Sequence, residues 1–129
     1  DKILSKLDPR LKVAALVYEK YVVELSKAAD ALLRMHGKKI ADEQYQLKRV
    51  ADLTIDLFIG LCVLARADAL SKSDKKNGQQ AVTIAAIFAQ QAKRRMARNV
   101  RSMGRNEDEE RDALAGFMLE NGAYPWDVI

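Results

Sequence analysis

Residues 32–67 read LLRMHGKKIADEQYQLKRVADLTIDLFIGLCVLARA, and this stretch holds the end of one helical pattern and the start of the next. Gly37 lies between the two patterns, and glycine commonly follows the last residue of a helix. We therefore expect one helix over about residues 11–35 and a second over about residues 39–70.

Apolar residues recur every three or four positions in both predicted helices, which is the pattern of a helix with one buried face. In the first helix the predicted core stripe consists of Leu11, Ala14, Tyr18, Val22, Leu25, Ala29 and Leu32. In the second the predicted inward residues are Ile40, Leu47, Val50, Ala51, Leu57, Phe58, Leu61 and Ala65.

Two further helical patterns follow. Residues 71–78 are polar and charged and end in an Asn-Gly pair, a composition typical of a turn. A third helix is then expected over about residues 79–103 and a fourth over about residues 107–121, which leaves a tail at 122–129. The predicted inward stripe of the third helix is Ala81, Ala85, Phe88, Ala92, Met96, Val100 and Met103. The tail is expected to fold back onto the bundle through Tyr124, Pro125 and Trp126.

Composition agrees with a single helical domain. The chain has 129 residues, 49% of them hydrophobic, with two prolines and only 6% aromatic side chains. Four amphipathic helices joined by short connections must alternate in direction. The sequence therefore predicts an all-α, up-and-down four-helix bundle over residues 1–129.

A set of polar and apolar positions carries a resemblance to a known family. It consists of Asp8-Pro9-Arg10-Leu11, Leu32-Leu33-Arg34, Gly37-Lys38-x-Ile40, Glu43-Gln44, Leu47-Lys48-Arg49-Val50-Ala51, Ile55-x-Leu57 and Leu64-Ala65-Arg66-Ala67. These positions resemble the extra C-terminal helical domain of very-long-chain acyl-CoA dehydrogenase and of acyl-CoA dehydrogenase family member nine. The family's opening motif is His-Pro-x-Leu, so Asp8 departs from it.

The resemblance implies a parent enzyme that oxidises an acyl-CoA thioester at its α and β carbons with bound FAD, in fatty acid β-oxidation. It also implies that the flavin site, the acyl-CoA cleft and the catalytic glutamate precede this region. We therefore expect a non-catalytic chain with no cofactor of its own, which stabilises the catalytic body or its dimer, or docks it on a membrane or partner. Because the first residue is Asp1 rather than a methionine, we expect the chain to be a fragment of a longer enzyme.

Location is an expectation that depends on the source. In a bacterium the parent enzyme would be cytoplasmic, and in a eukaryote it would lie in the mitochondrial matrix or at the inner-membrane face. The longest apolar run, residues 57–65, is less than half of the roughly 20 residues that a membrane span needs.

Residue types that bind metals or act as nucleophiles are sparse. A di-iron bundle needs Glu-x-x-His pairs, but the one histidine, His36, has Leu33 three residues before it. We therefore expect no metal site and interpret His36 as a cation at a helix C-terminus. The one cysteine, Cys62, is expected to be buried and inert.

Glu43 and Gln44 form a polar pair beside the predicted core, with Gln44 on the inward face. One interpretation makes Glu43 a general base. The other, which we favour, makes it a carboxylate paired with a cation such as Arg34 or Lys48, because buried polar groups need partners.

Residues 93–105 contain six cations and no acid. At about 100° per residue, four of them form a basic stripe opposite the apolar one. The stripe consists of Arg94, Arg98, Arg101 and Arg105. One interpretation is a solvated face balanced by the acids of residues 107–112. The other is a surface for an anionic membrane or an acidic partner. The alternative to a domain of a parent enzyme is a stand-alone helical interaction module that binds an acidic surface through this stripe. Nucleic acid is disfavoured, because the net charge is only +4 and no aromatic residue is interleaved.

The middle of the second helix is apolar on more than one side. Ile55, Ile59 and Val63 recur at intervals of four and point away from the predicted inward face. Contiguous exposed apolar patches usually mark interfaces. We therefore predict that these three residues contact the catalytic body of the parent enzyme or a second copy of the domain. The alternative is that the first helix or the tail, residues 124–129, covers them.

Overall fold

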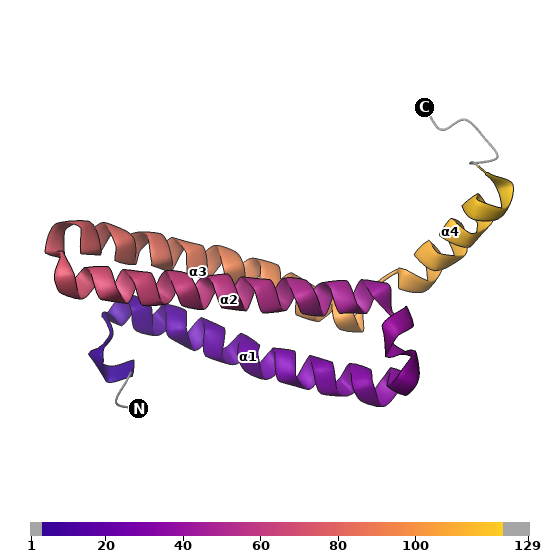
Figure 1. Cartoon of the computed structure of the whole chain (residues 1–129), viewed down its shortest axis with the longest axis horizontal. Helices are drawn as coiled ribbons and strands as arrows, with labels where there is room; N and C mark the ends of the chain where they lie inside the picture. Colours follow the sequence, from indigo (N-terminus) through magenta and orange to yellow (C-terminus); the bar gives the residue numbers. More distant parts are fainter. Residues whose placement is uncertain (1–3, 123–129) are drawn as a thin grey trace.

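The computed structural model describes residues 4–122, which form six helical elements and no strand. The α-helices are α1 (Pro9–His36), α2 (Gln44–Ser73), α3 (Lys75–Gly104) and α4 (Asp108–Asn121), and the short 3-10 helices are η1 (Leu4–Lys6) and η2 (Gly37–Asp42). The expected all-α helical bundle is therefore confirmed. Figure 1 shows α1, α2 and α3 lying side by side, with α4 extending from one end.

The ends of α1 follow from local chemistry. The Asp8 side chain caps the first turn, because its Oδ1 accepts a hydrogen bond from the Arg10 backbone N–H at 2.9 Å, and Pro9 follows the cap directly. Gly37 ends the helix with a φ of +53°, a conformation that favours glycine. The chain then makes η2 before α2 begins, so α2 starts later than the sequence predicts.

The predicted turn over residues 71–78 is wrong, because only Asp74 separates α2 from α3. Asp74 caps α3, with its two carboxylate oxygens accepting from the backbone N–H and the side-chain amide of Asn77. A β carbon at Gly78 would lie 2.6 Å from the carbonyl oxygen of Leu70. Asn77 and Gly78 therefore belong to the start of α3, where they allow the two helices to approach closely.

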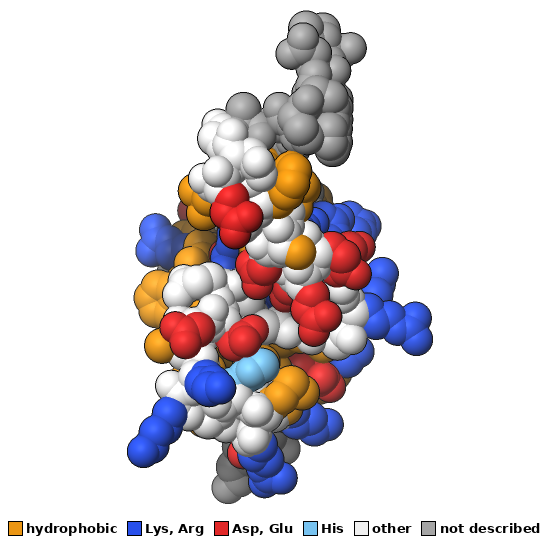
Figure 2. Space-filling model, turned by 90° about the vertical axis from the view of Figure 1, so that its right-hand side faces the viewer, with side chains coloured by type: hydrophobic (Ala, Val, Ile, Leu, Met, Phe, Trp, Pro, Cys, Tyr) orange, Lys and Arg blue, Asp and Glu red, His pale blue; other side chains and the backbone are white. Residues whose placement is uncertain are grey.

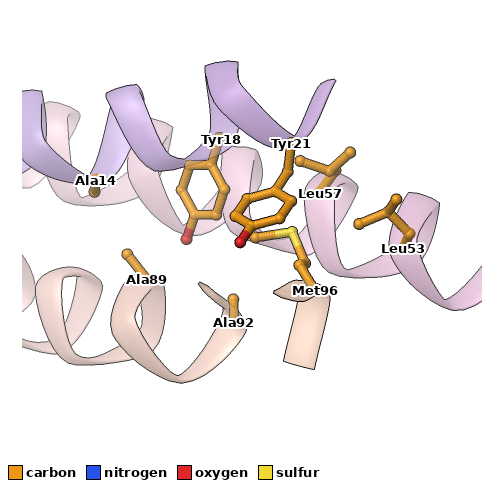
Figure 3. Packing of buried hydrophobic residues seen from close by; sticks show 8 residues of the cluster. All are labelled: Ala14, Tyr18, Tyr21, Leu53, Leu57, Ala89, Ala92 and Met96. Atoms are coloured by element: carbon orange, nitrogen blue, oxygen red, sulfur yellow. The ribbon is translucent and has the colours of Figure 1, made fainter. Parts of the chain in front are cut away.

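The core lies between the three long helices. Its larger cluster, drawn in Figure 3, consists of Ala14, Tyr18, Tyr21, Leu53, Leu57, Ala89, Ala92 and Met96. The tyrosine rings of α1 extend toward the alanines of α3, which leave room for them. A β carbon at Gly60 would overlap the Tyr18 ring, so a glycine is required there. A second cluster consists of Leu11, Ala67, Val82 and Ala85.

The predicted stripes differ in how well they match the buried residues. The α3 stripe is close to correct, with Ala85, Ala92 and Met96 buried. The α1 stripe is correct at four positions, Leu11, Ala14, Tyr18 and Leu32, but Val22 is exposed and Tyr21 is buried in its place. The large ring of Tyr21 fills the space between α2 and α3. Val22, the next residue, therefore lies at the edge of the core.

For α2 the predicted inward face is largely wrong. Phe58 is 69% exposed, and Leu61, Ala51 and Ala65 are exposed as well. The residues that α2 buries are Gln46, Leu53, Leu57, Gly60 and Ala67. Apolar side chains surround much of this helix, so their spacing does not identify the face that packs.

The fourth helix contributes little to the core. None of the residues of α4 is buried, and it points away from the other helices in Figure 1. The packed part of the bundle is thus made by three of the four helices. The predicted fold-back of Tyr124, Pro125 and Trp126 lies outside the described residues. Within residues 4–122, no helix is long and apolar enough to cross a membrane.

Candidate functional site

The exposed side of α2 carries a patch of large apolar residues within two helical turns. We call it the α2 apolar face, and its members are Ile55, Phe58, Ile59 and Leu61. Ile59 is 42% exposed, and α1 does not cover it or Ile55. Val63 differs from these residues, because it is half-buried and packs against the smaller core cluster.

Two hollows adjoin this face on the side of α3. One, of about 330 Å³, is lined by Asp52, Ile55, Asp56, Arg95, Arg98 and Asn99. Inside it Asp56 forms an ion pair with Arg95 at 2.9 Å, which links α2 to α3. The other, of about 310 Å³, is lined by Cys62, Val63, Arg66, Ala67, Ala81 and Ile84.

Cys62 is exposed, so the expectation of a buried thiol is wrong. The sequence placed Cys62 inside the apolar part of a helix, and that helix turns an apolar side toward solvent. The error therefore has the same cause as the errors at Phe58 and Leu61.

The four arginines of the basic stripe are exposed on the outer side of α3. Among the described residues, none of the four has an ion-pair partner. Two acids of the run 107–112 pair elsewhere, since Asp108 binds Arg49 and Glu107 lies 3.9 Å from Arg111. The acidic run therefore does not neutralise the stripe by direct contact.

A polar junction that sequence reasoning missed joins α2 to the start of α4. The Arg49 guanidinium donates two hydrogen bonds to the Asp108 carboxylate, at 2.7 and 2.8 Å. The hydrogen bonds from Arg49 lower the pKa of Asp108, and the same interaction raises the pKa of Arg49. Both side chains are half-buried, with 13% and 14% of their surface exposed, so the pair holds the first turn of α4 in place.

Gln46 completes this junction. Its Nε2 donates to the carbonyl oxygen of Met103 at 2.9 Å, and its Oε1 accepts from Arg49 at 3.0 Å. Gln46 is buried, whereas Gln44 is exposed and donates to the backbone of Ala41. The expectation that Gln44 points inward is therefore wrong. The spacing of Gln46 and Arg49, three residues apart, was the available signal for a polar face at this end.

Glu43 pairs with a residue that sequence reasoning did not choose. One of its carboxylate oxygens lies 3.5 Å from Nδ1 of His36, which joins the end of α1 to the start of α2. The two expected partners are engaged elsewhere, Arg34 with Asp30 and Lys48 with Asp52. Within residues 4–122, no three histidine, cysteine or acidic side chains gather into a metal site.

Family comparison agrees with the helical architecture and with the resemblance seen in the sequence. The family described as ACAD9/ACADV, C-terminal domain, matches residues 9–119. The match includes all three packed helices and most of α4. The chain therefore belongs to the family of C-terminal domains of acyl-CoA dehydrogenases of this type.

Proposed function

We propose that this chain is a non-catalytic domain that attaches to the catalytic body of a parent acyl-CoA dehydrogenase and stabilises it. In this proposal the body contains the FAD and the acyl-CoA cleft, and it carries out the oxidation step of fatty acid β-oxidation. The domain contributes a surface that binds the catalytic body, and it contributes no reacting group. The parent enzyme would work in the cytoplasm of a bacterium, or in the matrix or at the inner-membrane face of a mitochondrion.

The α2 apolar face is the observation that supports this proposal. Burying one large apolar side chain stabilises a protein by about 1.5 to 3 kcal/mol relative to leaving it in water. Four such residues, Ile55, Phe58, Ile59 and Leu61, are exposed within seven positions of one helix. A patch of this kind is typical of an interface whose apolar centre is surrounded by charged residues. Here Asp52, Arg66 and Arg98 supply the charged surroundings.

Replacing Ile59 with Lys tests the attachment. The change places a charge in the centre of the face, so the domain should no longer bind the catalytic body when both are expressed as separate chains. Because Ile59 is partly exposed, the isolated domain should keep its helical circular dichroism and its melting temperature. Binding is measured by co-purification and by sedimentation of the mixture.

Val13→Lys is the matched control, because Val13 is a β-branched residue of α1 that is about as exposed as Ile55. It should leave the attachment intact. Equal binding by the Ile59→Lys and Val13→Lys variants would contradict the proposal. Unfolding of the Ile59→Lys domain would instead assign Ile59 to the core.

A second candidate function rests on the basic stripe, whose four arginines have no ion-pair partner among the described residues. We propose that the stripe attracts an anionic membrane surface or an acidic partner. Binding to vesicles of anionic lipid should appear at low salt and weaken as salt screens the charges. Changing Arg94, Arg98 and Arg101 to Gln should abolish the binding. Equal recovery of both proteins on such vesicles at low salt would contradict this candidate.

A further inference from the structure

The fourth helix carries an apolar stripe that is largely exposed in the part of the chain that the structure describes. Leu114, Phe117 and Met118 follow the spacing of one helix face, and Leu114 and Phe117 are both exposed. A helix of 14 residues is marginally stable in water unless a partner packs against it. This stripe therefore needs a surface to pack against.

The bundle offers such a surface at the same end of the molecule. A groove of about 340 Å³ runs between the second half of α1 and the end of α3, and its lining is mostly apolar. We call it the end groove, and it is lined by Glu24, Lys27, Ala28, Ala31, Leu32, Met35, Gln46, Val100, Met103 and Gly104. The alanines and the glycine are small, which is what close approach of another helix requires.

The end groove and α4 match in length. The wall of the groove on α1 extends over residues 24–35, or about 16 Å at 1.5 Å per residue. By the same rise, the 14 residues of α4 extend over about 21 Å. One α4 helix therefore covers the whole groove.

Charge also favours this pairing. The α4 helix contains five acidic side chains and one arginine. Of the residues that line the end groove, Lys27 is basic and Glu24 is acidic, and the stripe residues Arg101 and Arg105 flank the lining residues Met103 and Gly104 in the sequence. Figure 2 looks onto this end of the molecule, where acidic side chains gather near the centre and Lys and Arg side chains stand around the edge. An acidic helix in the end groove would therefore lie near Lys27, with Arg101 and Arg105 close by in the sequence.

The junction prevents α4 from turning into the end groove of its own chain. Asn106 donates to the carbonyl oxygen of Ser102 at 2.8 Å and accepts from the backbone N–H of Asp108 at 3.1 Å. With the two hydrogen bonds from Arg49, these contacts fix the direction in which α4 leaves the bundle. Reversing that direction would break them.

We propose that α4 is an arm exchanged between two copies of this chain. In the dimer, each copy packs its Leu114, Phe117 and Met118 stripe into the end groove of the other. A two-fold axis relates the two copies, so the two contacts are equivalent. The junction remains intact, and the acids of α4 approach the arginines of the partner copy. The α2 apolar face takes no part, so this inference does not depend on the proposed attachment to a catalytic body.

Association of the chain provides the first test. Sedimentation equilibrium should show a monomer–dimer equilibrium that shifts at least tenfold toward monomer in the double variant Leu114→Gln and Phe117→Gln. Leu119→Gln is the matched control, because Leu119 is 85% exposed and lies on the opposite side of α4. The control should associate like the natural chain. A monomeric natural chain at all concentrations, or equal association of the two variants, would overturn the proposal.

Cross-linking provides the second test and distinguishes exchange from fold-back. Ala31→Cys lies at the middle of the end groove and Ala113→Cys beside the apolar stripe of α4, both in a Cys62→Ser background. A mixture of the two single-cysteine proteins, treated with a short bismaleimide, should yield a covalent dimer. Each protein alone should yield much less. A cross-link that forms only within a chain carrying both cysteines would overturn exchange in favour of fold-back, and no cross-link at all would overturn both.

Discussion

The α2 and α3 helices have the same length, 30 residues each, and pack against each other along most of it, yet they present different surfaces to solvent. Outside its core stripe, the second half of α3 presents arginines. Outside its core stripe, α2 presents isoleucine, phenylalanine and leucine. The difference teaches that the second half of α3 has one apolar face, which the bundle uses, whereas the middle of α2 has two apolar faces and the bundle uses only one of them.

The largest effect that tests this contrast is expected at a pair of leucines on α2. Leu53 is fully buried, and Leu61 is 46% exposed. Leu53→Ala should lower the free energy of unfolding by about 2 to 5 kcal/mol, because it leaves a cavity between the helices. Leu61→Ala should lower it by less than about 1 kcal/mol. Urea denaturation measures both values. Similar losses would mean that α2 packs on both faces within one chain.

A pair of glycines on α3 tests the close approach at the turn. Gly78→Ala should destabilise by about 1 to 3 kcal/mol, because its β carbon would collide with the backbone of Leu70 and the helices would have to separate. Gly104→Ala meets no atom within 4 Å and should be neutral or stabilising by up to about 1 kcal/mol. Thermal unfolding of both variants gives the comparison. A neutral Gly78→Ala would show that the helices tolerate a wider turn.

The junction between α2 and α4 predicts a smaller effect that depends on pH. The hydrogen bonds from Arg49 hold the pKa of Asp108 below its usual range in the folded chain. A lowered carboxylate pKa contributes stability above the unfolded value of about 3.9, and that stability is lost as pH falls through the folded pKa. Asp108→Asn should therefore lower stability at neutral pH and flatten its loss below about pH 4.

Urea midpoints at neutral and acidic pH measure this effect. Glu109→Gln is the control, since Glu109 is exposed and lies next to Asp108 without an ion-pair partner in the described part of the chain. An unchanged pH dependence in Asp108→Asn would show that the Arg49 contact opens freely in solution.

Sequence reasoning predicted some parts of this molecule and failed at others for physical reasons. The buried side of α3 was predictable, because Ala85, Ala92 and Met96 face the core while the arginines occupy the other side. The buried side of α2 was not, because Leu57 packs inside and the neighbouring Phe58 does not, although both have the same apolar character.

Sequence reasoning did not predict the partners of the polar side chains, because these partners are distant in the sequence. Arg49 binds Asp108, 59 residues away, and Gln46 binds the backbone 57 residues away. No spacing rule within one helix predicts such pairs. The exposure of Ile55 and Ile59, which the second apolar repeat of α2 suggested, agrees with the structure. Their role in an interface stays a prediction.

The single residue between α2 and α3 has a consequence for the order in which the chain folds. Contacts between the two helices are nearly symmetrical about Asp74. Nearest the turn, Gly78 approaches Leu70, and farther along the hairpin Arg95 pairs with Asp56. At the far end, Gln46 donates a hydrogen bond to the backbone of Met103. Loop closure costs least for the contacts nearest the turn. We therefore expect this hairpin to form from Asp74 outward, so that the end with Gln46 and Met103 closes last and opens most often. Amide hydrogen exchange in native conditions should accordingly be slowest near the turn and should quicken toward that end.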